Sequence, residues 1–450
     1  MSFNSLLFVF LFLPVSVILS FVCKNNNLFI VLISFLFYAW GNPISLVLLI
    51  LYILLNYFTA LSFEKAEGKQ RKITLIIAIV VQVAVLFIYK YLDFFLPFIK
   101  VELHAPIGLS FFTFSCLSYL LDVYFGKCNA QHNLIRLALY VSFFGKVTMG
   151  PIVQYNEMVD QIDNHPFQID LFCDGIKKLC IGLTKKVILA DSLSLVHMNL
   201  MESQSVLGSW LLAITYMLQI YFDFSGYSDM AIGIGEMFGF KFKQNFNYPY
   251  IATSIQDFWR RWHISLSLWF RDYIYIPLGG SREGNNKYIR NIFVVWLLTG
   301  LWHGANWTFI VWGLYFAVLL LFEKFVLKKF WDKVPKFICH IYTLFLVLIS
   351  WIFFMSDSLS SAFQCILHMF GMQASLLDSV ALFNLKSSFI LLVISILFCL
   401  PIRDKIELFI CSKWKQKGMI GLVVVYLVVF LVSVSFMISS SFHSFLYFAF

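Results

Sequence analysis

Charged residues are scarce along the whole chain. Asp, Glu, Lys and Arg make up 13% of the 450 residues, whereas 60% are hydrophobic and 19% are aromatic. An ordinary soluble domain has roughly 25% charged residues, so this chain has too few to cover a water-facing surface. Many apolar runs are long enough to cross a bilayer, which takes roughly 20 residues. The composition therefore excludes a soluble globular protein and predicts an all-α polytopic membrane protein.

Motifs for metals, nucleotides and disulfides are also scarce. The nine cysteines are scattered without a CxxC pair, and they are expected to be small buried hydrophobic residues. The glycine-rich stretch 221–242, YFDFSGYSDMAIGIGEMFGFKF, lacks the GxGxxG spacing of a dinucleotide loop. Its small residues are more typical of close helix packing. No bound metal or cofactor is therefore expected.

The excess positive charge, +9 in total, gathers near the ends of apolar runs. Such clusters are typical of cytoplasmic loops under the positive-inside rule, so the basic residues favour a lipid bilayer over nucleic acid as partner. Counting spans from these clusters, with a turn at Asn42-Pro43, predicts that both termini lie outside the cytoplasm. The three clusters are Lys65, Lys69, Arg71 and Lys72; Lys324, Lys328, Lys329, Lys333 and Lys336; and Arg403, Lys405, Lys413, Lys415 and Lys417.

The apolar runs are predicted to be membrane helices, some of them re-entrant or interfacial. The first run lacks a basic region before it and is expected to be a retained span rather than a signal peptide. The runs are 5–22, 28–41, 44–62, 73–89, 107–125, 134–150, 175–199, 206–225, 291–306, 308–323, 337–355, 388–402 and 420–438. Residues 226–290 are too apolar for a free loop and too polar for a span, which indicates re-entrant or interfacial helices.

The stretch WRRWHISLSLWF places a histidine among three tryptophans. If 255–270 forms one helix, Trp259, Trp262, His263, Leu266 and Phe270 fall on one face. An interfacial helix with an aromatic belt and snorkelling arginines explains the tryptophans and arginines. It does not explain the histidine, so both a structural and a functional role for His263 stay open.

His303 lies between the apolar runs 291–302 and 308–323, within LTGLWHGANW. An ionisable side chain at such a place is costly and is a functional candidate. A neutral imidazole can accept a proton from a hydroxyl, as a general base must. The flanking Gly300 and Gly304 would let a substrate approach the backbone closely. From the residues alone, catalysis and a buried hydrogen-bonding role both remain open.

Four segments resemble the membrane-bound O-acyltransferase family. They are QIYFDFSGYSDMAIGIGEMFGF, NFNYPY, FWRRWHISLSLWFRDYIYIPLGGSR and GLWHGANWTFIVWG. The resemblance is closest to the bacterial polysaccharide branch, the alginate O-acetylase-like proteins. It extends to IGLSFFTFSCLSYLLDVYFGK, GPIVQY, GLTKKVILADSL and SWIFF, and so spans most of the chain. Met355-Ser356 and Gln154 depart from the pattern of that branch, which puts the acceptor in doubt but not the histidines.

The resemblance implies a ring of transmembrane helices around a central tunnel that the polar residues line. It implies one membrane domain over 1–450, with N-terminal helices in 1–200, a catalytic core in 206–325 and C-terminal helices in 337–450. The family's invariant histidine corresponds to His303 and its second catalytic position to His263. The residues expected to contact substrate are Trp302, Asn306, Trp262, Arg260, Arg261, Arg271, Asp223 and Ser225.

The predicted function is transfer of an acyl group, most simply acetyl from acetyl-CoA, across the membrane for O-acetylation of a cell-envelope or exported polysaccharide. His303 would deprotonate the acceptor hydroxyl and His263 would orient the donor or stabilise charge, while the three arginines could attract the phosphates of coenzyme A. The resemblance also implies an extracytoplasmic acyltransferase partner. The alternatives are a transporter without covalent transfer and, within the family, transfer of D-alanyl or acylation of protein or lipid.

The C-terminal stretch SFHSFLYFAF, 441–450, ends in aromatic residues. An aromatic belt at the membrane surface accounts for them, and similar endings with a central tyrosine are common in the branch that the chain resembles. The alternative is that Tyr447 accepts acetyl near His303 and relays it to a partner.

Replacing Tyr447 by Phe separates these two interpretations, because it keeps the aromatic ring and removes the hydroxyl. If Tyr447 is the relay, Tyr447→Phe abolishes polymer acetylation as fully as deletion of 445–450. Ester-linked acetate on isolated glycan measures the outcome. Full acetylation by Tyr447→Phe would rule out the relay and leave the tail as an anchor or docking strip.

Overall fold

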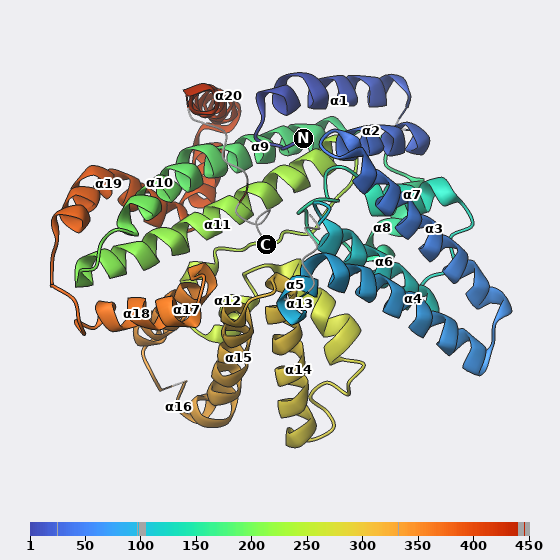
Figure 1. The fold of residues 1–450 in the computed structure, drawn as a ribbon. Coiled ribbons are helices and arrows are strands. Elements are labelled where there is room, and N and C mark those ends of the chain that lie inside the picture. The colour runs from blue at the N-terminus through green and yellow to red at the C-terminus, as the bar shows by residue number, and fades with distance from the viewer. Residues whose placement is uncertain (25, 97, 99–104, 332, 440–444, 446–450) are drawn as a thin grey trace. The chain divides into compact units, whose positions relative to one another are not determined.

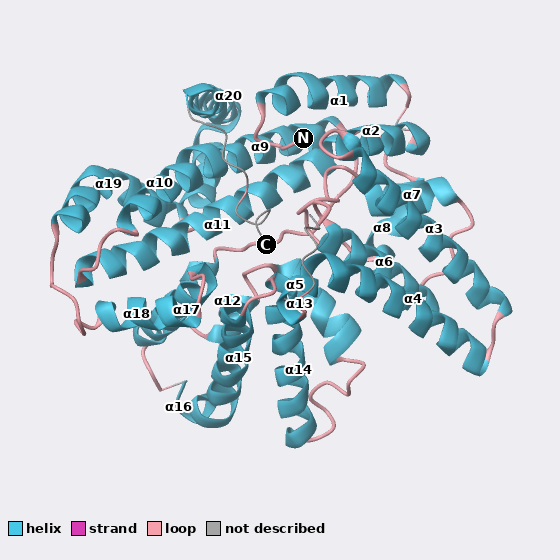
Figure 2. Cartoon of the chain, in the orientation of Figure 1, coloured by secondary structure: helices cyan, strands magenta, loops and turns pink. Residues whose placement is uncertain are grey.

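The computed structural model describes residues 1–24, 26–96, 98, 105–331, 333–439 and 445. In this part of the chain the regular elements are helices, and no strand occurs (Figure 2). The described residues include seven helices long and apolar enough to cross a membrane. They are Pro43–Lys65, Gly68–Lys90, Val206–Met237, Trp307–Trp331, Lys336–Met355, Ser379–Phe398 and Ile402–Ser439. The prediction of an all-α polytopic membrane protein is therefore confirmed.

The described chain divides into two compact units. The first consists of Met1–Cys180 and Tyr227–Gln244. Within it α2 packs on α7, and α3 packs on α4 and α6 (Figure 1). Asparagine side chains at 26, 42 and 133 accept the first backbone N–H groups of α2, α3 and α7, as helix N-caps do. The elements of this unit are η1 (Phe8–Phe12), α1 (Leu13–Val22), α2 (Asn27–Ala39), α3 (Pro43–Lys65), α4 (Gly68–Lys90), α5 (Leu92–Phe95), α6 (Leu109–Tyr124), α7 (Leu134–Ser142), α8 (Tyr155–Asp163) and most of α9 (Ile169–Thr184).

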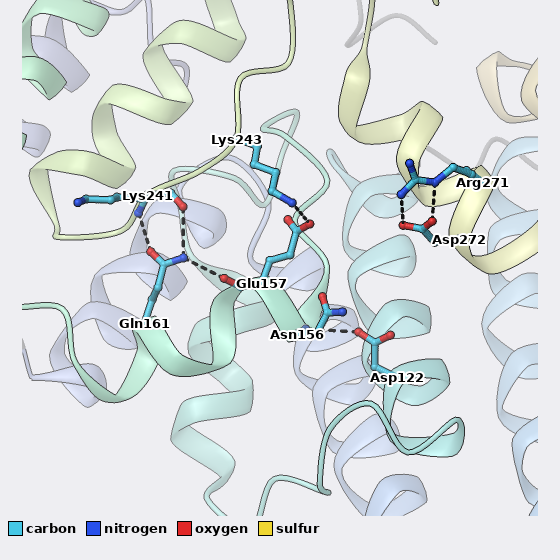
Figure 3. Close-up of polar contacts among 8 residues, drawn as sticks. All are labelled: Asp122, Asn156, Glu157, Gln161, Lys241, Lys243, Arg271 and Asp272. Atoms are coloured by element: carbon cyan, nitrogen blue, oxygen red, sulfur yellow. Dashed lines mark hydrogen bonds and ion pairs between the residues drawn. The ribbon is translucent and has the colours of Figure 1, made fainter. Parts of the chain in front are cut away.

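Side-chain hydrogen bonds tie α8 to the non-helical segment 241–243 of the same unit (Figure 3). The amide of Gln161 accepts from the backbone N–H of Lys241 at 2.7 Å and donates to its carbonyl at 3.2 Å. Glu157 forms an ion pair with Lys243. These bonds satisfy the backbone of a stretch that has no helical partner of its own.

The second unit consists of Ile181–Gly226 and Asn245–Phe450 and contains both predicted catalytic histidines. In it α14 and α15 lie side by side as an antiparallel pair (Figure 1). Its elements are η2 (Lys185–Ala190), α10 (Asp191–Leu200), the first part of α11 (Val206–Met237), η3 (Pro249–Ile251), α12 (Ile255–Trp259), α13 (Ile264–Phe270), η4 (Arg271–Tyr275), α14 (Asn285–His303), α15 (Trp307–Phe322), η5 (Glu323–Leu327), α16 (Lys328–Trp331), α17 (Lys336–Met355), α18 (Leu359–Met369), α19 (Ser379–Phe398) and α20 (Ile402–Ser439).

Glycines allow the α14–α15 pair to pack at close range. A Cβ atom on Gly313 would lie 2.3 Å from the carbonyl oxygen of Trp296, and one on Gly300 would lie 2.5 Å from that of Phe309. Real Cβ atoms do not approach oxygen so closely, so any larger residue here would push the helices apart. The glycines of 221–242 act in the same way, since Gly233 meets the carbonyl of Gly175 in the first unit. The interpretation of that stretch as a helix-packing segment is confirmed.

Several predicted span boundaries are wrong. The run 134–150 is helical only as far as Ser142 in α7, because Gly145, Gly150 and Pro151 follow and favour a turn. The run 206–225 continues as a helix to Met237, since its small and polar residues are buried and do not interrupt α11. The run 388–402 covers the second half of α19 and passes its end at Phe398, and α19 begins earlier, at Ser379 behind the N-cap Asp378. The predicted single domain over 1–450 stays a prediction.

Candidate active site

His303 is the last residue of α14. The helix ends here because Gly304 and the following residues leave the helical conformation, and Asn306 then starts α15 by accepting the N–H of Thr308 at 3.0 Å. The amide of Asn306 also donates to the carbonyl of Asp357 at 2.9 Å. Asn306, a predicted substrate contact, therefore has two structural bonds that hold the turn carrying His303.

Aromatic rings from three helices surround the imidazole of His303, and the residue is 4% exposed. Ring centroids lie 4.9 Å from Trp302 of α14, 4.9 Å from Trp312 of α15 and 5.0 Å from Phe354 of α17. The rings of Trp312 and Phe354 meet the imidazole nearly edge to face, an arrangement that aromatic quadrupoles favour. Phe354 lies within the motif SWIFF and Trp312 within GLWHGANWTFIVWG, but the sequence alone did not predict that either residue contacts His303.

The glycines beside His303 face protein rather than open space. The Cβ position of Gly300 points at the carbonyl of Phe309, and that of Gly304 lies 2.7 Å from the Phe309 ring. The expectation that these glycines let a substrate approach the backbone is therefore wrong on this face. They let α15 approach, which brings Trp312 onto His303.

His263 lies between two short helices, not within one. The predicted continuous helix over 255–270 is wrong, because α12 ends at Trp259 and α13 begins at Ile264. His263 itself has φ +45°, in the left-handed region. A non-glycine residue there is strained by roughly 1–2 kcal/mol, and such strain persists only where surrounding contacts enforce it.

Three contacts hold the His263 side chain, which is 1% exposed. Its Nδ1 lies 3.3 Å from Oδ1 of Asn245. Its ring centroid lies 4.7 Å from that of Phe224 in α11 and 5.9 Å from that of Trp302 in α14. Burial lowers the pKa of His263 to about 3, so the imidazole is neutral at physiological pH.

Trp302 packs against both histidines. Its ring contacts His263 on one side and His303 on the other, with centroids 5.9 Å and 4.9 Å away. The structure thus brings His263, Trp302 and His303 together within one unit, although 40 positions separate the histidines in the sequence (263 to 303). Trp262 lies beside this group against Trp351, at 4.9 Å.

The three predicted arginines divide into two kinds. Arg260 and Arg271 line a cavity of about 860 Å³ in the second unit. Arg261 does not line it, and instead forms an ion pair with Asp257 at 2.9 Å. Arg271 also pairs with its neighbour Asp272 at 2.7 Å (Figure 3).

Basic side chains and the carboxylate of Glu323 line the cavity, together with residues close to the two histidines, although neither histidine lines it. Lys324 and Lys328 contribute to its lining. The lining also includes Ile264, adjacent to His263, and Thr299, one helical turn before His303. The same cavity therefore contacts basic side chains and residues near the histidines, and its cations would attract anionic groups.

Glu323 fixes the start of α12, a role that the sequence did not indicate. One carboxylate oxygen accepts the N–H of Ile255 at 2.7 Å and the other accepts that of Gln256 at 3.2 Å. These are two of the N–H groups that a helix start leaves without an intrahelical partner. Glu323 therefore connects the end of α15 to the helix that precedes Arg260 and His263.

Asp223 belongs to a buried ion network. Lys186 lies 2.7 Å from Asp223 and 2.8 Å from Asp191. The ring of Phe445 covers the Lys186 ammonium at 4.6 Å. Ser225 is fully buried two residues further on, and Phe224 between them contacts His263. Tyr447 lies outside the described residues.

The model of the membrane-bound O-acyltransferase family matches residues 44–365. The chain therefore belongs to the membrane-bound O-acyltransferase family and is a membrane-bound acyltransferase, which favours covalent transfer over the alternative of a transporter.

Curated relatives narrow the class. The chain is 39% identical to the probable alginate O-acetylase AlgI of Pseudomonas aeruginosa, over 82% of this chain and 75% of the relative. It is 36% identical to the peptidoglycan O-acetyltransferase of Helicobacter pylori, over 82% of this chain and 80% of that relative. The teichoic acid D-alanyltransferase of Bacillus subtilis is 32% identical over 52% of this chain and 62% of its own length. The chain is thus alginate O-acetylase-like, as the motifs predict.

We expect Glu323→Ala to destabilise the protein by about 1–3 kcal/mol, because it leaves the N–H groups of Ile255 and Gln256 without acceptors. Thermal unfolding of the purified protein in detergent measures the effect. Glu283→Ala is the matched control, since Glu283 forms an exposed ion pair with Lys287 and should change the midpoint little. Equal midpoints for the two variants would show that the Glu323 cap does not hold α12.

Proposed function

We propose that this chain transfers an acetyl group from acetyl-CoA for O-acetylation of a cell-envelope or exported polysaccharide. The observation that carries the proposal is the packing of His263 and His303 against Trp302, close to residues that line a cavity with basic side chains. The relatives named alginate O-acetylase and peptidoglycan O-acetyltransferase support a polysaccharide as the final acceptor.

His303 is the proposed general base. A neutral imidazole takes the proton of the acceptor hydroxyl while the hydroxyl oxygen attacks the thioester carbonyl carbon. The carbon–sulfur bond then breaks, an oxygen ester forms, and the proton passes from His303 to the leaving thiolate. The surrounding rings of Trp302, Trp312 and Phe354 exclude water, which would otherwise compete with the acceptor.

The donor is proposed to bind in the cavity lined by Arg260, Arg271, Lys324 and Lys328. These cations suit the phosphates of coenzyme A, and arginine in particular binds phosphate through its planar fork. Lys324 and Lys328 belong to a basic cluster that the positive-inside rule assigns to the cytoplasm. The donor would therefore enter from the cytoplasmic side of the cell membrane, with both chain termini on the opposite side.

Transfer to an external polymer needs a second component in this proposal. The described residues form two compact units. We propose that a separate extracytoplasmic acyltransferase receives the acetyl group and transfers it to the polysaccharide. Tyr447 is the proposed relay between His303 and that partner. Transfer of D-alanyl is the alternative within the family, supported by a relative that matches about half of the chain.

His303→Ala should abolish acetyl transfer, because it removes the proposed general base, whereas His263 is proposed to orient the donor. The purified protein is assayed for release of free thiol from acetyl-CoA and for transfer of labelled acetyl, with D-alanyl donors in parallel. His340→Ala serves as control, since the His340 imidazole bonds the carbonyl of Ala252 and has no proposed catalytic role. Undiminished activity in His303→Ala would refute the assignment.

Arg260→Ala should raise the KM for acetyl-CoA roughly tenfold, which corresponds to ~1.4 kcal/mol, with a smaller change in kcat. The reason is loss of a cation that faces the cavity. Arg261→Ala is the matched control, because Arg261 is adjacent in sequence but is paired with Asp257. If both variants raise KM equally, or neither does, the cavity is not the phosphate site.

A further inference from the structure

Asn245 holds the turn that carries His263. Its backbone carbonyl accepts the N–H of Ile264 at 2.9 Å. Its side-chain oxygen accepts the N–H of Ser265 at 3.1 Å and the hydroxyl of Ser265 at 2.9 Å. Asn245 is itself 1% exposed. These bonds fix the residues that follow His263, whose backbone is left-handed, and such strain persists only where surrounding contacts hold it.

The backbone N–H of Ser265 identifies which end of the Asn245 amide faces the turn. A backbone N–H can only donate, so the atom that it meets must be the oxygen Oδ1 and not the NH₂ group. The same Oδ1 lies 3.3 Å from Nδ1 of His263.

The identity of that oxygen decides the tautomer of His263. An amide oxygen cannot donate, so the hydrogen bond requires the proton on Nδ1 of the imidazole. In the neutral ring the other nitrogen, Nε2, then carries the lone pair. Nε2 is buried and meets no hydrogen-bond partner among the described residues. Nε2 of His263 is therefore a buried hydrogen-bond acceptor that a ligand could use.

We propose that Asn245 is a positioning residue that holds His263 as the Nδ1–H tautomer, so that Nε2 meets the bound donor as a hydrogen-bond acceptor. The inference rests on the proposed function, in which His263 orients the donor. The inference also makes the proposed role of His263 more specific, because a neutral acceptor binds an N–H or O–H group of the ligand. It would not stabilise a developing oxyanion, which needs a hydrogen-bond donor.

The charges near His263 leave the neutral form favoured. The neighbouring α11 brings Asp223, which is paired with Lys186. The segment before His263 brings Asp257 and Arg261, which are paired with each other. Helix α14 brings the second histidine, His303, beyond Trp302. Burial is the cause of the lowered pKa of His263.

Asn245→Asp tests the proposal because the carboxylate keeps the acceptor geometry and adds a charge. The carboxylate favours the imidazolium and raises the pKa of His263. Below that raised pKa, Nε2 carries a proton and cannot accept. The variant should therefore be about 10–100-fold slower than wild type at mildly acidic pH, because the donor loses a buried hydrogen-bond acceptor. The ratio of its rate to the wild-type rate should rise with pH. Asn245→Ala should be slow at every pH.

Asn384→Ala is the matched control for removing a buried amide. Asn384 is 3% exposed and its amide donates to the carbonyl of Val380 within α19. Its transfer rate should have the wild-type dependence on pH. An Asn245→Asp variant with a wild-type pH profile would overturn the proposal, because the new carboxylate would then not act on the protonation of His263.

A direct measurement covers the case in which the Asn245 variants do not fold. ¹⁵N spectra of histidine-labelled wild-type protein, minus those of His263→Asn, isolate the imidazole of His263. The proposal expects a protonated Nδ1 and an unprotonated Nε2, and the opposite tautomer or a cation would overturn it. The proposed function fails separately, if wild type transfers no acetyl or if His263→Ala retains full activity.

Discussion

Burial of two imidazoles among aromatic rings is the constraint on which the site depends. A buried polar group is costly unless its atoms have partners, and each histidine here is held by its surroundings in a particular way. His303 lies at a helix end where three aromatic rings enclose it. His263 lies in a strained turn where Asn245 bonds one ring nitrogen. In both cases the local backbone breaks a helix at the histidine, so the side chain leaves the regular packing of the helix surface.

The charged residues near the aromatic rings around the two histidines are neutralised in ion pairs. Asp223, the nearest acidic residue along α11, is engaged with Lys186, and Arg261 is engaged with Asp257. Basic side chains instead gather on the lining of the cavity, where Arg260 and Lys324 face space large enough for a ligand. The arrangement separates attraction of an anionic ligand from the chemistry at the histidines. The arrangement also distinguishes the adjacent Arg260 and Arg261, because only Arg260 lines the cavity. Their positions in the sequence do not reveal this difference.

Close helix packing makes the site possible. Gly300 and Gly313 bring α14 within contact of α15, and this contact places Trp312 over His303. Glu323 at the end of α15 then binds the start of α12, so the same helix positions elements around both histidines. Substitutions at these glycines would act on the site through helix separation rather than through loss of a catalytic group.

The sequence by itself determined the class of fold and the family, and it singled out His263 and His303 as candidates. Low charge and long apolar runs require membrane helices, because nothing else satisfies the backbone in lipid, and the motifs around His263 and His303 are long enough to mark the family. It could not determine that 255–270 is two helices, since the turn at His263 is bonded to Asn245, eighteen positions earlier. It could not separate Arg260 from Arg261, or reveal Glu323 as a helix cap and Trp302 as the contact between the histidines. These properties depend on which distant segments meet, and tertiary packing alone decides that.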